Sequence, residues 1–199
     1  MELGSGDGAG VLAAARKAPK TLCVGIDTDA AAPREASARA ARAALKGGTP
    51  NAIFLVADAR ALPAPFLGVI DELRIILPWG SLLRAVLSAD QQIVTLIADG
   101  LRPGGSASIV VSVLPTDERA IGAKTSHGGL TTLAASLERT GLQIRTPRAV
   151  EPEDLHELRS SWARRLGVPA RRAATLLVAT RPMGTASASA APIAVRPTW

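Results

Sequence analysis

A glycine-rich run near the start of the chain has the composition of a ligand-binding turn. Residues 4–10 contain four glycines and lead directly into an alanine-rich segment. Glycines let a ligand approach the backbone closely, and N–H groups at the start of a helix point outward toward it. Gly4, Gly6 and Ala9 also satisfy the dinucleotide pattern G-x-G-x-x-G/A, so a nicotinamide dinucleotide is one candidate ligand.

Two acidic residues follow this run at the ends of apolar segments. Asp27 ends the next segment, Ala57-Asp58-Ala59 follows the one after it, and Glu2 stands before the first glycine. This order and spacing resemble those of class I S-adenosylmethionine-dependent methyltransferases. In such an enzyme Asp27 would accept both ribose hydroxyls, Asp58 with the Ala59 amide would read the adenine edge, and the glycine run would lie against the methionine part.

Two tryptophans stand where a substrate could meet that cofactor. Trp79 follows the apolar segment Ile70–Ile76, and Trp162 precedes the last apolar segment. In an open α/β sheet the carboxyl ends of the strands face the ligand crevice, so we expect Trp79 beside the cofactor's methyl group. Two indoles could sandwich a flat base. The plainer alternatives are a core residue under the next helix for Trp79 and a helix-face anchor for Trp162.

The segments around these tryptophans carry a more specific resemblance. Residues 77–84 read Leu-Pro-Trp-Gly-Ser-Leu-Leu-Arg, residues 161–166 read Ser-Trp-Ala-Arg-Arg-Leu, and Asp71-Glu72-Leu73 opens the strand before the first segment. They resemble the kanamycin–apramycin resistance methyltransferases, which methylate N1 of an adenine in the decoding site of 16S ribosomal RNA. The likeness runs from about Glu2 to Thr180.

The resemblance implies three groups of site residues. A catalytic group would stack on a flipped adenine and shape its pocket: Trp79, Trp162 and Ser161. A second group would hold S-adenosylmethionine, whose product is S-adenosylhomocysteine: Gly4, Ser5, Gly6, Asp7, Asp27, Thr28, Ala57, Asp58, Ala59, Leu77 and Trp79. A third would hold RNA phosphates: Arg164, Arg165, Arg171 and Arg172. We expect no metal.

Three features depart from the family pattern. Arg60 stands where relatives carry a glutamate, and the insertion between Val113 and Leu130 is short. Only Met1–Leu3 precede the glycine run, where a class I fold has a buried first strand. We therefore expect a truncated central strand, a start codon further upstream, or another segment in its place.

Adenine N1 chemistry places few demands on side chains. This nitrogen is unprotonated at neutral pH, so its lone pair attacks an electrophilic methyl group without a general base. Catalysis is then mostly positioning. The chain has no tyrosine, one cysteine and two histidines, His127 and His156, which we interpret as surface residues. Cys23, inside an apolar segment, is interpreted as a packing residue.

The elements that must position these residues alternate between strand-length and helix-length segments. This alternation predicts an α/β, class I (Rossmann-like) methyltransferase fold, with a mostly parallel seven-stranded sheet and helices on both faces. The strands are expected at Thr21–Ile26, Ala52–Val56, Ile70–Ile76, Ala107–Val113, Leu142–Arg145 and Ala174–Thr180. The helices are expected at Gly8–Lys17, Ala30–Leu45, Leu82–Leu101 with a break near Ser88, Gly129–Thr140 and Glu151–Leu166.

The length and composition limit the classes of protein to which this chain can belong. The 199 residues, 47% hydrophobic and 20% charged, suit one domain at 1–182, and the low-complexity segment 183–199 is expected to be a disordered tail. A single cysteine excludes an intramolecular disulfide. No apolar run reaches the length of a membrane span and no signal peptide is evident, so we expect a cytoplasmic protein and a monomer.

The basic residues gather in the second half of the chain. The whole net charge of +6 lies in residues 100–199, and 19 of the 23 cations are arginine, which suits phosphate contacts. This predicts a polyanionic partner, namely 16S rRNA in the small ribosomal subunit. A GC-rich genome is the alternative explanation of the arginine excess, although it does not explain the clustering.

Other functions remain open at this point. A methyltransferase for a small molecule would not need the basic half, and its activity would not fall with salt as RNA binding does. A truncated homologue could dock on the ribosome or RNA without holding cofactor. A nicotinamide oxidoreductase is a third, weaker alternative.

Overall fold

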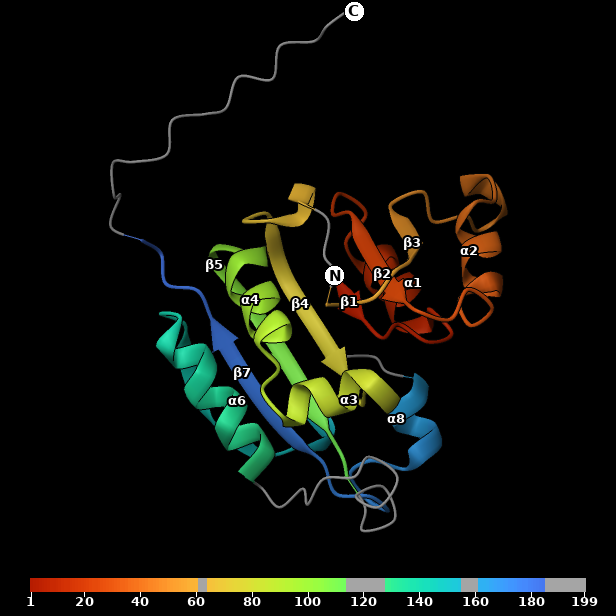
Figure 1. The fold of residues 1–199 in the computed structure, drawn as a ribbon. Helices are drawn as coiled ribbons and strands as arrows, with labels where there is room; N and C mark the ends of the chain where they lie inside the picture. Colours follow the sequence, from red (N-terminus) through yellow and green to blue (C-terminus); the bar gives the residue numbers. More distant parts are fainter. Residues whose placement is uncertain (61–63, 114–127, 155–160, 185–199) are drawn as a thin grey trace, which may run out of the picture.

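The fold is built around one sheet of seven strands. The computed structural model describes residues 1–60, 64–113, 128–154 and 161–184, without the side chains of residues 64, 128, 129, 161, 162 and 164. The strand order is β3-β2-β1-β4-β5-β7-β6 (Figure 1). The strands span Glu2–Leu3 (β1), Cys23–Asp27 (β2), Ala52–Val56 (β3), Ile70–Ile76 (β4), Leu101–Val111 (β5), Gln143–Ala149 (β6) and Thr175–Thr180 (β7).

Most of the sheet is parallel. Strands β3, β2, β1, β4 and β5 run in one direction, and β7 lies antiparallel between β5 and β6. The predicted seven-stranded, mostly parallel sheet is therefore confirmed. Parallel strands bring all their carboxyl ends to one edge, which is where open α/β sheets place their ligands.

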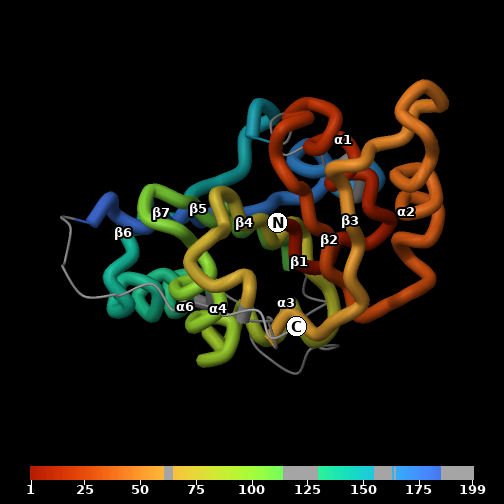
Figure 2. Tube along the Cα trace, turned by 90° about the horizontal axis from the view of Figure 1, so that it is seen from above, coloured from red at the N-terminus to blue at the C-terminus, as the bar shows by residue number. Residues whose placement is uncertain are grey.

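Helices cover both faces of this sheet, as predicted (Figure 2). One face carries α3, α4 and α6, and the other carries α1, α2 and α8. Their bounds are Ala9–Lys17 (α1), Arg34–Ala40 (α2), Gly80–Leu87 (α3), Gln91–Gly100 (α4), Gly128–Arg139 (α6) and Ser161–Leu166 (α8), with short 3-10 turns at Ala44–Lys46 and Ala64–Phe66.

Most predicted elements are confirmed, and the main corrections have local causes. The predicted helix at 30–45 is reduced to α2, because Pro33 caps it at one end and the chain turns into a 3-10 helix before Gly47 at the other. The expected break near Ser88 separates α3 from α4, with Ala89 at φ 51°. Strand β5 begins earlier than predicted, through an irregular register around Gly104.

Some predictions fall outside the described residues. Of the helix predicted at 151–166, residues 155–160 are not described, and α8 is its last part. Residues 114–127 and the tail beyond 184 are not described either, so the shortened insertion and the disordered tail stay predictions. Within the described ranges, no helix is both long and apolar enough to cross a membrane.

Strand β1 is short but completely enclosed. Glu2 pairs with Gly25 on one side and Arg74 on the other, and Leu3 pairs with Ile26 and Ile75. The Leu3 side chain is fully buried in the largest core cluster, under α3 and α4. Strand β1 comprises two residues here, and these two residues connect the two halves of the sheet.

We predict that Leu3→Ala lowers the free energy of unfolding by about 2–5 kcal/mol, because it opens a cavity at the centre of the sheet. Urea denaturation followed by circular dichroism measures this change. Leu45→Ala is the matched control, since Leu45 is fully exposed, and should change stability by less than about 0.5 kcal/mol. Equal effects of the two substitutions would contradict a structural role for β1.

Candidate active site

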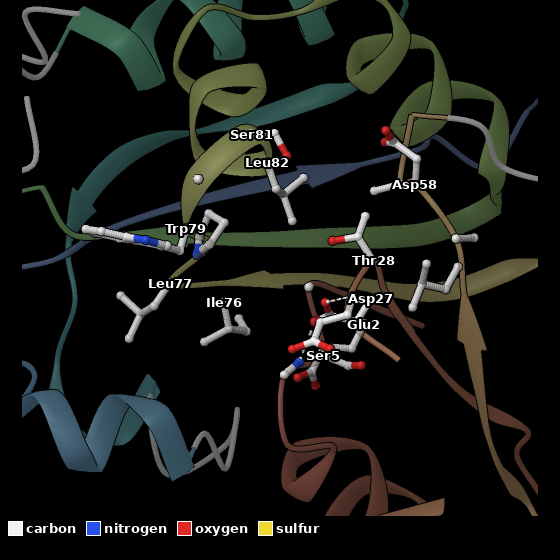
Figure 3. A pocket seen from close by; sticks show the side chains of 18 of the residues that line it. Glu2, Ser5, Asp27, Thr28, Asp58, Ile76, Leu77, Trp79, Ser81 and Leu82 are labelled. Carbon is white, nitrogen blue, oxygen red and sulfur yellow. Dashed lines mark hydrogen bonds between the residues drawn. The ribbon is translucent and has the colours of Figure 1, made fainter. Parts of the chain in front are cut away.

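A cavity opens at the carboxyl ends of β1, β2, β3 and β4. Its volume is about 620 Å³, within the usual range of small-molecule sites. All eleven predicted cofactor residues line it, together with other residues from the same strand ends (Figure 3). The lining residues are Glu2, Gly4, Ser5, Gly6, Asp7, Gly10, Ile26, Asp27, Thr28, Asp29, Ala57, Asp58, Ala59, Arg60, Ile76, Leu77, Pro78, Trp79, Gly80, Ser81, Leu82 and Arg165.

The glycine run is held in place by β2. The backbone N–H groups of Gly4 and Ser5 both donate to the Ile26 carbonyl, at 2.8 and 3.1 Å. The Gly6 N–H donates to Asp27 Oδ2 at 2.8 Å. Gly8, at φ 70°, admits no side chain, because an added Cβ would lie 2.5 Å from the Phe54 ring. The turn is therefore fixed by the neighbouring strand as well as by β1.

Asp27 keeps acceptor capacity for a ligand. Its Oδ2 accepts from Gly6 and its Oδ1 accepts from the Asp29 N–H at 3.0 Å. A carboxylate offers about two acceptor positions on each oxygen. One position on each oxygen therefore stays available, which is what the two hydroxyls of a ribose require.

Two further observations fit an adenosyl cofactor on the glycine run. The Ser5 hydroxyl is buried and, among the described residues, has no hydrogen-bond partner. A Cβ at Gly6 would meet nothing within 4 Å, so this backbone is open on one side. Buried polar atoms are normally satisfied, so this hydroxyl, which lies beside Gly25 beneath the turn, is an exception next to the cavity.

Glu2 is a carboxyl group that is largely withdrawn from solvent. It lies beneath the turn, where a Cβ on Gly10 would come within 2.8 Å of its Oε2. Desolvation raises the pKa of Glu2 to about 7, although Arg74 and the chain's amino group pull it the other way. Glu2 precedes the first glycine in the sequence but was not among the predicted site residues. Its position next to the glycine run, in the first strand, is the signal from which Glu2 could have been predicted as a site residue.

Asp58 lies on the rim of the same cavity, but its carboxylate is engaged. Arg60 donates to it from the side chain and the backbone, and this pairing lowers the pKa of Asp58 to about 2. The predicted reading of adenine by Asp58 and Ala59 stays a prediction. Arg60 was noted as a departure from the family, whereas its ion pair with Asp58 was not foreseen.

Trp79 stands at the opposite side of the pocket from Asp58 (Figure 3). Leu77, the residue after β4, has a φ of 50°, a strained conformation for a leucine, and Pro78 follows. This turn places Trp79 at the N-cap of α3 with 61% of its surface exposed. The alternative of a core tryptophan is therefore wrong.

Helix α8 borders the pocket through Arg165. The Arg165 guanidinium lies 4.0 Å from Asp7 and lines the cavity. Arg171 is exposed, and Arg172 donates to the Ser112 hydroxyl at 2.8 Å and to the Ser112 carbonyl at 2.9 Å.

The remaining predicted residues of α8 are only partly described. Ser161, Trp162 and Arg164 belong to the helix, but their side chains lie outside the described part of the structure. Their roles, like those of the other predicted site residues, stay predictions.

A mostly parallel seven-stranded sheet, with an anchored glycine turn and an acidic residue at the end of β2, defines a class I S-adenosylmethionine-dependent methyltransferase. Comparison with known proteins identifies the family. Residues 1–181 match the NpmA family, described as 16S rRNA (adenine(1408)-N(1))-methyltransferase. The chain belongs to this family.

Individual relatives agree with this assignment. A 16S rRNA (adenine(1408)-N(1))-methyltransferase of Streptoalloteichus tenebrarius is 35% identical, over 83% of this chain and 79% of the relative. A solved variant of the enzyme of that name from Catenulisporales acidiphilia, with cosubstrate SAM, has a TM-score of 0.76 at 30% identity and covers 91% and 84% of the two chains. The aminoglycoside resistance methyltransferase NpmB1 has a TM-score of 0.76 at 31% identity, covering 90% and 85%.

We predict that Asp27→Ala weakens S-adenosylmethionine binding by about tenfold or more, because the ligand loses its acceptors and the Gly6 N–H loses its anchor. Asp27→Asn, which keeps one acceptor oxygen, should show a smaller loss. Isothermal titration calorimetry measures both affinities. Glu35→Ala on the exposed surface of α2 is the control, and an affinity of Asp27→Ala equal to that of this control would contradict the site.

The raised pKa of Glu2 predicts a pH-dependent stability. The protonated carboxyl favours the folded state, so this contribution is complete below the ordinary value of 4.5 and is lost as the pH rises through about 7. Glu2→Gln keeps the shape of the side chain without titrating. Urea denaturation should therefore show nearly equal stabilities near pH 4.5 and a variant more stable by about 3 kcal/mol at pH 8. Parallel pH profiles for the two proteins would contradict the burial of this charge.

Proposed function

We propose that this protein transfers the methyl group of S-adenosylmethionine to N1 of the adenine at position 1408 of 16S rRNA, and so protects the ribosome from aminoglycosides. The family match over residues 1–181 supports the reaction. The observation that carries it in this chain is the pocket itself. An anchored glycine turn and Asp27 form one wall, and an exposed indole stands at the opposite rim.

The chemistry of the pocket suits a reaction that needs no general base. S-adenosylmethionine, when bound, supplies a methyl group on a positively charged sulfur. Adenine N1 has a free lone pair at neutral pH, so no side chain has to remove a proton first. Of the described residues that line the pocket, none is a histidine, cysteine or lysine. The chain's own residues therefore act by positioning the two reactants.

Trp79 is the described residue best placed to hold the target base. An indole face stacks on a base with about 1–3 kcal/mol of stabilisation. Methylation at N1 leaves the base with a positive charge, and an aromatic face stabilises a nearby cation. We propose that Trp162 supplies the second face from α8 and that Ser161 shapes the pocket between them. Extruding a base costs a few kcal/mol, which favours an adenine that is already mobile.

Arginines on the α8 side of the pocket are proposed to hold RNA phosphates. Arg165 and Arg171 have exposed side chains, and Arg165 stands at the pocket rim. Arg164 is proposed for the same role. Arg172 is proposed to contact phosphate as well, in addition to its two hydrogen bonds to Ser112. We further propose that the assembled small subunit is the substrate, since a small protein must recognise its target through the shape of the subunit surface and the phosphates of its RNA.

The proposed product explains resistance in physical terms. A methyl group at N1 removes a hydrogen-bond acceptor from the Watson–Crick edge of the adenine. The positive charge that it creates repels the ammonium groups of aminoglycosides. Both effects weaken drug binding without the protein remaining on the ribosome.

Primer extension on small subunits incubated with protein and S-adenosylmethionine tests the proposal. N1 methylation blocks reverse transcription, so a stop at one decoding-site adenine is expected. Binding to subunits should weaken as salt increases. Methyl transfer that is insensitive to salt and leaves the RNA unmodified would point instead to a small-molecule substrate.

We predict that Trp79→Ala lowers the rate of methyl transfer to subunits by about ten- to a hundredfold, as loss of one stacking face implies. Cofactor affinity should change by less than about threefold, because Asp27 and the glycine turn are untouched. Trp79→Phe keeps an aromatic face and should retain most of the activity. Transfer of radiolabelled methyl groups gives the rates and calorimetry gives the affinities. Unchanged turnover in Trp79→Ala would remove the stacking role.

A further inference from the structure

Leu77 joins the turn that carries Trp79 to a buried part of the core. It is the residue after β4 and is 6% exposed, whereas Trp79, two residues further on, is 61% exposed. The Leu77 N–H donates to the Val110 carbonyl of β5 at 2.8 Å, so its backbone is fixed to the sheet. Its φ of 50° turns the chain away from the strand direction. The backbone of Leu77 therefore sets the direction in which the chain leaves the sheet toward Trp79.

The Leu77 side chain belongs to the core cluster on which α8 rests. This α8 cluster is distinct from the larger cluster under α3, α4 and α6. The Leu77 side chain points toward α8, while the Trp79 ring extends in another direction (Figure 3). Ala163 of α8, 1% exposed, lies in the same cluster. The buried members of the α8 cluster are Ile76, Leu77, Val110, Val150, Ala163, Val168, Ala174 and Leu176.

Leu77 thus connects the two elements that carry the proposed base-stacking residues. Its backbone leads to Trp79, and its side chain lies in the cluster that contains Ala163, the residue after Trp162 in α8. Two aromatic faces can hold a base between them only when their separation fits the thickness of the base. A displacement of about 1 Å can lower a rate by about a hundredfold. A change of volume in the α8 cluster is therefore expected to affect catalysis through the position of α8.

We propose that Leu77 is a positioning residue for methyl transfer: its left-handed backbone directs Trp79 outward, and its buried side chain sets the position of α8 relative to Trp79. This inference rests on the proposed function, since it concerns a base held between Trp79 and α8. It deepens that function by naming the residue that fixes the spacing of the site. It also explains a leucine in a strained conformation, because glycine would relieve the strain but supply no side chain to the cluster.

The experiment compares variants that remove, keep or exceed the volume of the α8 cluster. Leu77→Ala leaves the backbone hydrogen bond to Val110 and opens a cavity in the cluster. Leu77→Met keeps nearly the same volume and is the conservative variant. Ala163→Val overfills the cluster from α8 and changes none of the described residues that line the pocket.

Steady-state methyl transfer to small subunits gives kcat and KM, and calorimetry gives the affinity for S-adenosylmethionine. We expect Leu77→Ala and Ala163→Val to lower kcat by about thirty- to a hundredfold, because α8 moves relative to Trp79. Leu77→Met should keep kcat within about threefold of wild type. The KM for subunits and the cofactor affinity should change much less than kcat, because the arginines of α8, Asp27 and the glycine turn are retained.

Leu137→Ala is the matched control, because Leu137 of α6 is a fully buried leucine in the larger core cluster. Thermal unfolding shows how far each variant is destabilised, and kcat is measured at a temperature at which the variants remain folded. Since Leu137 is outside the α8 cluster, the control should keep kcat within about threefold of wild type despite its lower stability.

Two results would overturn the inference and leave the proposed function intact. In one, Leu77→Ala methylates subunits as fast as Leu137→Ala. In the other, Leu77→Met is as slow as Leu77→Ala. If Leu77→Ala does not fold, Ala163→Val decides: a kcat within about tenfold of wild type overturns the inference, and a larger loss supports it. If wild-type protein binds S-adenosylmethionine but methylates no subunit RNA, the proposed function fails and the inference with it.

Discussion

The hydrogen bond from the Gly6 N–H to the Asp27 carboxylate is the contact on which the site depends. A glycine turn has little conformational preference of its own, so its shape must be imposed by what it is bonded to. Here β1 contributes only two residues before the turn begins. Strand β2 supplies the remaining restraint, through the Ile26 carbonyl and the Asp27 side chain. The same carboxylate that would hold the ribose thus also holds the loop.

Position at the carboxyl edge of the sheet gives ordinary residue types different chemical roles. Asp27 ends β2 and Asp58 lies two residues beyond the end of β3, yet Asp27 keeps an acceptor position on each oxygen whereas Asp58 is held by three N–H groups of Arg60. Glu2 is a third carboxyl at this edge, and its desolvated surroundings raise its pKa to about 7. The strained backbone of Leu77, the residue after β4, turns Trp79 outward. Neighbours, more than residue type, therefore determine what each group can do.

The arginines in the second half of the chain are of two kinds. Some make hydrogen bonds within the fold, and others keep exposed side chains. Arg172 ties the end of β5 to the segment before β7 through Ser112, and Arg181 donates to the Ala98 and Leu101 carbonyls. Arg165 and Arg171 instead keep exposed side chains. The net charge alone does not reveal which arginines are structural and which are exposed, because a guanidinium serves equally well as a structural donor and as a phosphate ligand.

The sequence by itself determined the alternation of strands and helices, the family, and a set of residues that gather at one cavity. Strands β3 and β4 have the predicted bounds, because apolar runs between turn residues are strong local signals. Only the tertiary structure decided that Asp58 is paired with Arg60, that Glu2 is desolvated, that Arg165 reaches the glycine turn, and that Trp79 faces solvent. The physical reason is that hydrogen-bond pairing, desolvation and exposure depend on atoms brought together by folding, which periodicity and composition do not describe.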